Sequence, residues 1–444
     1  MQLDILSDAA PTEIGSYFVA NYPPFHAWRP EHVPAALSAL ATPRPQPAPL
    51  GLYVHIPFCR KRCKFCYFRV YTDKNAEQVE TYLDALAREI ALYKRRAALA
   101  EREFEFVYFG GGTPSFLSTA QLERLVERIN RSWRWEAARE VTFECEPGTL
   151  KENKVRTIRR IGVTRLSLGV EHFDDEILEH NGRAHRSAEI HRAWDWIRSA
   201  GFDQVNIDLI AGLAGETDAK WSDVVAKALA LAPDSVTIYQ MELPRNTTFS
   251  RELRAGGGSG VASWERKRAW VEQAFRAFER AGYTVSSAYT LVRSQSTAGA
   301  SPANFVYRDS LWRGADMLGT GVASFSHLGG VHFQNADQWD DYLAAVDGDA
   351  PPIRRALPMT PRQRLIRELV LQLKLGRIDA EYFRAKFEVE IISEFAAAFD
   401  SLCRDGLAAP DGDRVTLTRA GLLRVDALLP RFFEPEFQNG TAAP

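Results

Sequence analysis

Three of the five cysteines in the chain fall within eight positions, in the stretch "YVHIPFCRKRCKFCYF". Cys59, Cys63 and Cys66 are candidate metal ligands, whereas Cys145 and Cys403 lie far away in the sequence. A structural zinc site needs four protein ligands, and iron–sulfur clusters are normally held by four thiolates. Three thiolates on a four-iron cluster would leave one iron open to a chelating small molecule. The spacing alone leaves two possibilities, such a cluster or a zinc site that Cys145 or a histidine completes.

Glycines and carboxylates follow two of the predicted strands. The stretch "FGGGTPS" begins at residue 109, and its glycines would let backbone approach a ligand closely. In "FECEPG", Glu144 and Glu146 share one face at the end of a strand. Ligand-binding residues gather at the carboxyl ends of barrel strands. The alternative for the glycines is an ordinary turn between a strand and a helix. The alternative for the carboxylates is a solvated strand edge that binds no ligand. Cys145 would point the opposite way, so we expect it in the core.

The elements that would position these residues repeat as strand, turn and amphipathic helix. We expect strands at 52–58, 104–110, 140–146, 165–171, 204–212 and 235–243, and helices at 77–100, 119–133, 187–200 and 218–231. Leu83, Leu86, Ile90 and Tyr93 share one face of the first helix. This alternation predicts parallel βαβ units of the α/β class. Six in a row favour an open, partial barrel, and a doubly wound sheet is the alternative.

The chain is expected to have three parts. The proline-rich stretch 43–50 indicates an extended linker, so residues 1–50 form an N-terminal extension. Residues 51–350 form the barrel and the segment that closes it, and 351–444 a C-terminal domain. Near its end, the order helix, turn, strand, turn, strand, helix is similar to a winged helix. No dense basic face accompanies it, so we do not expect DNA binding.

Composition excludes several classes of function. The 444 residues are 45% hydrophobic and carry a net charge of -2, which favours neither nucleic acid nor an anionic membrane as partner. No signal peptide is visible, and no apolar run approaches the roughly 18 residues of a membrane span. Five cysteines without a signal indicate a reducing compartment. We therefore expect a cytoplasmic protein.

The CxxxCxxC spacing, with Phe65 before the last cysteine, resembles the radical SAM superfamily. "GGGTPS", "RLSLGVEHFDDEILEHNGRAH", "NIDLIAGL" and "RDGLAAPDGDRVTLTRAGL" are similar to its oxygen-independent coproporphyrinogen III oxidase subgroup, from about residue 20 to 432. The resemblance implies a partial (β/α)6 barrel with a C-terminal winged-helix-like helical domain. It also implies a [4Fe-4S] cluster on the three cysteines, with S-adenosylmethionine (SAM) as co-substrate.

The resemblance also implies which residues bind the cofactors. The residues expected around SAM are Tyr53, Phe65, Gly111, Gly112, Thr113, Glu144, Met241 and Phe325. Glu171, Arg183 and Asp208 match positions around a second SAM in the oxidases. Glu171 departs from the pattern, because the family usually has glutamine there. Glu144, which would hold the amino group of SAM, and Glu171 are the expected catalytic carboxylates.

The expected chemistry is reductive cleavage of SAM to a 5′-deoxyadenosyl radical, with an electron from a donor such as flavodoxin or ferredoxin. The segments "GVEH", "CYFRVYTDKN" and "RVDALLPRFFEP", judged by resemblance, favour methyl or methylene transfer to an sp² carbon. The substrate would be an unsaturated or aromatic small molecule, and a second SAM would supply the carbon for C-methylation or cyclopropanation. The alternatives are oxidative decarboxylation of coproporphyrinogen III and haem carriage.

Overall fold

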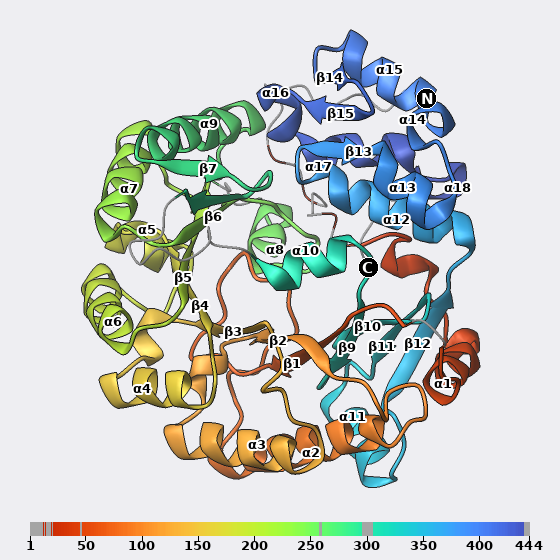
Figure 1. Cartoon of the computed structure of the whole chain (residues 1–444). Coiled ribbons are helices and arrows are strands. Elements are labelled where there is room, and N and C mark those ends of the chain that lie inside the picture. Colours follow the sequence, from red (N-terminus) through yellow and green to blue (C-terminus); the bar gives the residue numbers. More distant parts are fainter. Residues whose placement is uncertain are drawn as a thin grey trace. The chain divides into compact units, whose positions relative to one another are not determined.

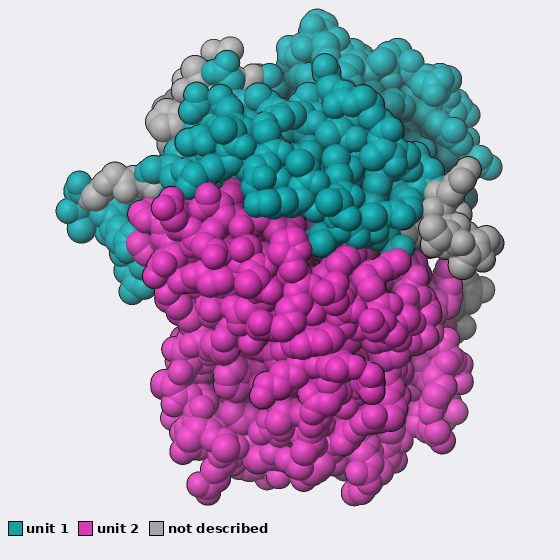
Figure 2. Space-filling view, turned by 90° about the vertical axis from the view of Figure 1, so that its left-hand side faces the viewer, with its two compact units in different colours: residues 1–26, 209–303, 360–444 teal, residues 27–208, 304–359 magenta. Residues whose placement is uncertain are grey.

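The computed structural model describes residues 12, 14, 19, 21–44, 47–256, 260–294 and 305–438. The chain divides into two compact units, which Figure 2 colours separately. Unit 1 comprises residues 1–26, 209–303 and 360–444, and unit 2 comprises residues 27–208 and 304–359. The expected domain limits at residues 50 and 350 are not the limits of these units, and they stay a prediction.

Parallel strands form the centre of unit 2. In spatial order they are β1 (Leu50–Ile56), β2 (Phe104–Gly111), β3 (Glu140–Cys145), β4 (Arg165–Glu171) and β5 (Gln204–Ala211), whose last residues belong to unit 1. The register pairs Val54 with Phe109, and Phe109 with Phe143. These strands are in parallel register, so their carboxyl ends meet at one edge of the sheet.

Helices connect these strands and lie outside the sheet in the order of the chain (Figure 1). They are α2 (Ala76–Lys94), α3 (Thr119–Ser132), α4 (Glu152–Arg160) and α6 (Ser187–Ala200). Capping boxes at Asn75 and Ser118 begin α2 and α3. The first helix ends at Lys94 rather than at residue 100, whereas α4 and the short α5 (Asp175–His180) were not predicted. The other expected helices and the strands agree closely with the structure.

Further strands extend the sheet beyond β1. Strand β9 (Asp316–Thr320) runs parallel to β1, and β10 (Phe325–Leu328), β11 (Val331–Asn335) and β12 (Ile353–Pro358) continue antiparallel. Helix α1 (Val33–Ala41) packs on β12 and β11, α10 (Val306–Trp312) on β2, and α11 (Trp339–Asp347) on α2. We did not predict these strands, which are four to six residues long.

Unit 1 contains the strands β6 (Ser235–Gln240), β8 (Thr290–Arg293) and β7 (Tyr283–Val285), joined antiparallel. Its helices before the C-terminal region are α7 (Asp218–Leu231), α8 (Thr248–Arg254) and α9 (Trp264–Arg280). None of the helices in the described residues has the length and apolar character needed to span a bilayer.

The C-terminal region is helical with one small sheet. Its helices are α12 (Pro361–Leu373), α13 (Ala380–Phe387), α14 (Ile391–Glu394), α15 (Ala396–Arg404), α16 (Arg419–Leu422), α17 (Val425–Leu428) and α18 (Pro435–Gln438). The strands β13 (Arg377–Asp379), β15 (Arg414–Leu417) and β14 (Ala408–Asp411) lie side by side in that order. The expected order of helix, strand, turn, strand and helix is therefore present.

Candidate functional site

The cysteine loop follows β1 and is held by backbone hydrogen bonds. The Cys59 amide donates to Tyr71 O (3.0 Å), and the Tyr71 amide donates to Pro57 O (2.7 Å). In the middle of the loop, the Lys64 amide donates to Asn181 O (3.1 Å). The loop is therefore fixed to the rest of unit 2 at its base and at its centre, which orders its thiols before any metal binds.

The three thiols of this loop influence one another. Burial, with a smaller contribution from the charge on the nearby Cys63, raises the pKa of Cys59 to about 11 and that of Cys66 to about 12. Binding a metal would displace these protons, since thiolates are the ligands. Cys145, by contrast, is buried in β3, where burial raises its pKa strongly, as expected for a core residue.

The set of donors on the cysteine loop is suited to a four-iron cluster. Cys59, Cys63 and Cys66 supply three thiols from one loop, and iron–sulfur clusters are held by thiolates. A structural zinc site would need a fourth protein ligand. Among the residues that the structure describes, no three His, Cys, Asp or Glu side chains form a group that could hold one metal ion.

The glycine triplet lies between the cysteine loop and a carboxylate. The Gly112 amide donates to Ile56 O at the end of β1 (2.9 Å), and Thr113 Oγ1 lies 3.3 Å from Cys59 Sγ. Gly111 has a φ of 113°, and an added Cβ would lie 2.4 Å from His55 Nδ1. This close approach requires glycine. The triplet therefore brings backbone directly beside the cysteine loop.

Glu144 ends in a pocket of tyrosines and backbone amides. Tyr108 Oη donates to its Oε1 (2.7 Å), and the Gly111 amide donates to its Oε2 (3.2 Å). Tyr53 stacks on Tyr108 with the ring centroids 5.9 Å apart. Burial raises the pKa of Glu144 to about 7. A carboxylate in such a place gains from a cationic partner, so an ammonium group suits it.

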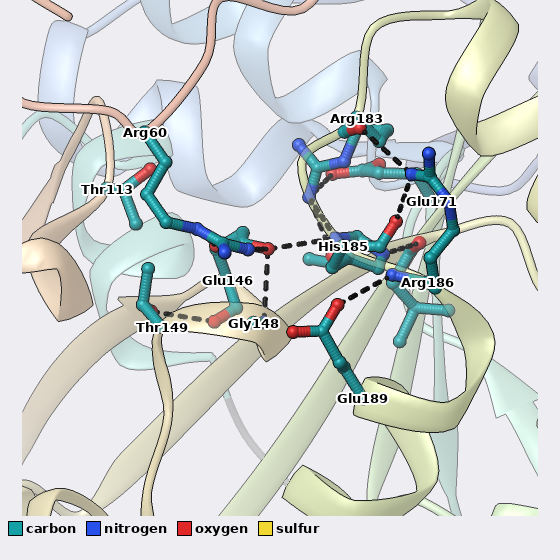
Figure 3. Close-up of polar contacts among 12 residues, drawn as sticks. Arg60, Thr113, Glu146, Gly148, Thr149, Glu171, Arg183, His185, Arg186 and Glu189 are labelled. Carbon is teal, nitrogen blue, oxygen red and sulfur yellow. Dashed lines mark hydrogen bonds and ion pairs between the residues drawn. The ribbon is translucent and has the colours of Figure 1, made fainter.

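Glu146, two residues further on, is already paired (Figure 3). Arg60 donates to both of its oxygens (2.9 and 3.1 Å), and His185 Nδ1 lies 3.1 Å from Oε1. Burial alone would raise the pKa of Glu146, but the bonds from His185 and Arg60 lower it to about 2. Sequence reasoning missed Arg60 and His185. The only signal was the position of Arg60 directly after Cys59.

The structure brings Glu171 and Arg183 together. Arg183 Nη2 lies 3.7 Å from Glu171 Oε1 and donates to Gly169 O (2.9 Å). Burial raises the pKa of Glu171 to about 7, and Arg183 opposes that rise. Glu171 has a φ of 62°, which is unusual for a residue with a side chain. Such outliers cluster at ligand sites.

Asp208 is the third carboxylate of this region. Ser167 Oγ donates to its Oδ2 (2.7 Å), and Asn206 Nδ2 donates to its Oδ1 (3.0 Å). Burial raises the pKa of Asp208, and its charge in turn contributes to the raised pKa values of Glu144 and Glu171. The three carboxylates therefore interact electrostatically, and their division between a first and a second SAM site stays a prediction.

The remaining expected residues are less closely connected. Tyr53 Oη lies 3.4 Å from His55 Nδ1, and Phe65 is partly buried in the cysteine loop. Phe325 packs edge-on against Trp28, with the ring centroids 5.6 Å apart. Met241 belongs to unit 1, where its buried position follows β6. The cofactor contacts of these residues stay predictions.

Comparison with known proteins finds one family model and relatives that match most of the chain. Residues 53–228 match the model of the radical SAM superfamily. The oxygen-independent coproporphyrinogen III oxidase of Synechocystis sp. is 27% identical over 422 residues, which cover 91% of this chain and 89% of the relative. The heme chaperone HemW of Bacillus subtilis is 26% identical over 373 residues, covering 84% and 96%. The solved coproporphyrinogen III oxidase of Escherichia coli matches with a TM-score of 0.80 and 25% identity, covering 94% of this chain and 96% of that one.

These relatives correct the expected activity. The prediction of a methyltransferase or cyclopropane-forming enzyme is wrong, because the relatives that match most of the chain are oxidases and heme chaperones. The segments that suggested carbon transfer, such as "GVEH", are local departures within a chain that otherwise follows the oxidases throughout.

The fold, the cysteine loop and the matches agree with one another. Residues 53–228 form a radical SAM domain, the chain is similar over most of its length to the oxygen-independent coproporphyrinogen III oxidases, and its cofactors are a [4Fe-4S] cluster and SAM.

Proposed function

We propose that the protein is an oxygen-independent oxidase that decarboxylates the propionate side chains of coproporphyrinogen III. The observation that carries this proposal is the match to the solved oxidase, which extends over 94% of this chain and 96% of that one with a TM-score of 0.80. The radical SAM model alone covers only residues 53–228. Likeness outside that range is what connects the chain to this activity rather than to radical chemistry in general.

The cofactors supply the hard chemistry, and the chain supplies binding and orientation. When bound, the cluster and SAM would supply a radical able to take a hydrogen atom from the substrate, and the electron released as carbon dioxide leaves would pass to a one-electron acceptor. Cys59, Cys63 and Cys66 would hold the cluster. Glu144 would bind the amino group of SAM, and the Gly111–Thr113 backbone lies between Glu144 and the cysteine loop. The external electron comes from a donor such as flavodoxin or ferredoxin.

A second SAM site would use Glu171, Arg183 and Asp208. Support comes from the grouping of the three side chains, since Arg183 contacts Glu171 and Asp208 raises the pKa of Glu171. Arg183 Nη1 and Nη2 already donate to Cys63 Sγ and Gly169 O, whereas its buried Nε has no partner among the described residues. A carboxylate ligand would therefore bind first at Nε.

The test is anaerobic turnover with coproporphyrinogen III, SAM and dithionite. We expect release of carbon dioxide, loss of propionate mass from the substrate, and formation of methionine and 5′-deoxyadenosine. Cys63→Ala is the control and should release none of these products, whereas Cys403→Ala should behave like the wild type. Cys403 lies in α15 of the C-terminal region, within unit 1. Intact coproporphyrinogen III after SAM has been cleaved would refute the proposal.

The second candidate is a haem-carrying protein. The heme chaperones of Bacillus subtilis and Lactococcus lactis match over 84% of this chain. A carrier would bind haem in a defined ratio and release no carbon dioxide from coproporphyrinogen III. Haem titration followed by visible absorption, beside the turnover assay on the same preparation, separates the two functions.

A further inference from the structure

The segment that carries Arg183 is pressed against the cysteine loop. It begins after α5 with Asn181, whose carbonyl accepts from the Lys64 amide (3.1 Å). Gly182 has a φ of 80°, and a Cβ there would lie 3.1 Å from Lys64 N and 3.4 Å from Cys63 Cα. A side chain at this position would be strained by the positive φ and would crowd the loop backbone, so glycine favours this approach. This close approach of the backbone places Arg183 beside the centre of the cysteine loop.

The Arg183 guanidinium contacts a thiol of the loop. Its Nη1 donates to Cys63 Sγ at 3.4 Å, and its Nη2 donates to Gly169 O at 2.9 Å. The Arg183 amide also donates to Leu178 O (2.8 Å), which fixes the main chain. The side chain is only 12% exposed. The buried guanidinium is thus fixed by its bond to Gly169 O and by the bonded main chain, and its Nη1 contacts the sulfur atom of Cys63.

A polar network behind Arg183 holds it and the loop together (Figure 3). His185 Nδ1 lies 3.5 Å from Arg183 Nη2 and 3.1 Å from Glu146 Oε1, and His185 Nε2 donates to Val170 O (3.2 Å). Glu146 in turn binds Arg60 with two hydrogen bonds. Because Arg60 follows Cys59 directly, Glu146 connects the start of the loop to the arginine at its centre.

We propose that Arg183 tunes the reduction potential of the cluster by donating a charge-assisted hydrogen bond to the Cys63 thiolate, and that Glu146 is a positioning residue acting through His185. Reduction transfers one electron from the external donor to the cluster and adds one negative charge. A cationic donor on a ligand sulfur stabilises the reduced cluster more than the oxidised one, because hydrogen bonds to the sulfur atoms and net charge set such potentials. The proposal rests on the proposed function only in requiring the cluster.

The test is a potentiometric titration of the reconstituted cluster, followed by electron paramagnetic resonance, without SAM or substrate. At the wild-type midpoint, Arg183→Met should lower the ratio of reduced to oxidised cluster about tenfold, which is about 59 mV for a one-electron couple. Arg183→Lys keeps the charge but lacks the planar guanidinium. Its ratio of reduced to oxidised cluster should lie between those of the wild type and Arg183→Met. Glu146→Gln should shift the ratio in the same direction by a smaller factor. Arg192→Met is the matched control, because Arg192 lies on the exposed side of α6 and should leave the potential unchanged.

Each outcome decides between the proposal and its rivals. If Arg183→Met does not assemble four irons, the same titration is made with Arg183→Gln. A wild-type potential in the arginine variants, with iron content intact, would overturn the tuning role. A wild-type potential in Arg183→Lys beside a shifted Arg183→Met would assign the effect to charge alone and overturn the hydrogen bond. An unshifted Glu146→Gln would overturn its positioning role. The titration contains no SAM, so binding at a second SAM site cannot produce these shifts. Failure of the proposed function would appear only in the carbon dioxide assay.

Discussion

Glu144 and Glu146 are two residues apart at the end of one strand, yet their surroundings shift their pKa values in opposite directions. Glu144 faces tyrosines and backbone amides, and burial raises its pKa to about 7. Glu146 is paired with Arg60 and His185, and its pKa falls to about 2. Glu144, which among the described residues accepts only from neutral donors, is therefore suited to a cationic ligand, whereas Glu146, which is paired with Arg60, serves the structure of the cysteine loop.

We predict that Glu144→Gln weakens SAM binding by about ten- to a hundredfold. A charge-assisted hydrogen bond to an ammonium group is worth roughly 1.5–3 kcal/mol, which corresponds to that change in dissociation constant. Equilibrium binding of SAM to the reconstituted protein measures it. Glu152→Gln, at the exposed start of α4, is the control. An unchanged dissociation constant in a folded Glu144→Gln protein would remove Glu144 from the site.

The same carboxyl predicts how SAM binding depends on pH. Its pKa in the free protein is raised to about 7, so the group is neutral below that pH and charged above it. SAM affinity should therefore fall as the pH drops through 7 to 6, because the carboxyl becomes neutral over this range. Glu144→Gln should lack this dependence. A wild-type affinity that is equally tight at pH 6 and 8 contradicts the prediction.

The three cysteines of the loop are predicted to be individually required. Cys63→Ala leaves two thiolates for a cluster that uses three, so two irons would lack a protein ligand. Anaerobic reconstitution followed by iron and sulfide analysis should show far fewer than four irons per chain. Cys145→Ala should keep the full complement, because Cys145 lies in the core of β3. Loss of metal in Cys145→Ala would restore the zinc alternative.

At the scale of elements, helix α2 carries a fully buried carboxylate that fastens the segment after β9. Glu89 accepts hydrogen bonds from the Gly321 amide (2.7 Å), Asn335 Nδ2 (2.6 Å) and Tyr342 Oη (2.7 Å). Each donor lies more than 200 positions further along the chain. This one side chain therefore connects the helix after β1 to the strands that extend the sheet.

We predict that Glu89→Ala lowers the free energy of unfolding by roughly 2–5 kcal/mol. The change removes this acceptor from the Gly321 amide and from Tyr342 Oη, whereas Asn335 Nδ2 keeps Gly321 O and Ser324 Oγ as partners. Each buried donor left without an acceptor costs about 1–3 kcal/mol before the structure relaxes. Glu89→Gln should cost less, because its amide oxygen still accepts one bond. Denaturant unfolding measures both, and Glu80→Ala on the exposed face of α2 is the control. Equal stability of Glu89→Ala and Glu80→Ala would show that the network does not hold the segment.

Whether a feature of the fold or of the site could be predicted from the sequence depends on how far apart along the chain the contacting residues lie. The strands β1 to β6 and the helices α2, α3, α6 and α7 follow from hydrophobic periodicity, which is local. The cysteine spacing and the position of Glu144 at a strand end are local as well. The pairing of Glu146 with Arg60 and His185, and of Arg183 with Cys63, depends on contacts 39 to 120 residues apart. No local pattern records such contacts, so the spacing alone did not separate the roles of Glu144 and Glu146, and only the family resemblance pointed to Glu144.

At the scale of the whole molecule, unit 1 is assembled from three separate stretches of the chain. Lys374 at the end of α12 is fully buried, and its Nζ donates to Val19 O (2.5 Å) and contacts Asp426 Oδ1 (3.0 Å). Asp426 also accepts from the Val19 amide (3.2 Å) and from Tyr289 Oη. The ion pair thus binds residues from all three stretches, which no division of the sequence by composition predicts.

We predict that Lys374→Met lowers the free energy of unfolding of unit 1 by roughly 3–5 kcal/mol, because removing one partner of a buried ion pair leaves an uncompensated charge. The double variant Lys374→Met with Asp426→Asn should be more stable than the single variant, since the orphaned carboxylate is then neutral. Both are compared by denaturant unfolding with Arg419→Met, an exchange at a partly exposed ion pair of the same unit that should cost far less. If the two buried substitutions destabilise additively, with no recovery in the double variant, Lys374 and Asp426 do not act as a pair. The segment around Val19 would then be held by other contacts.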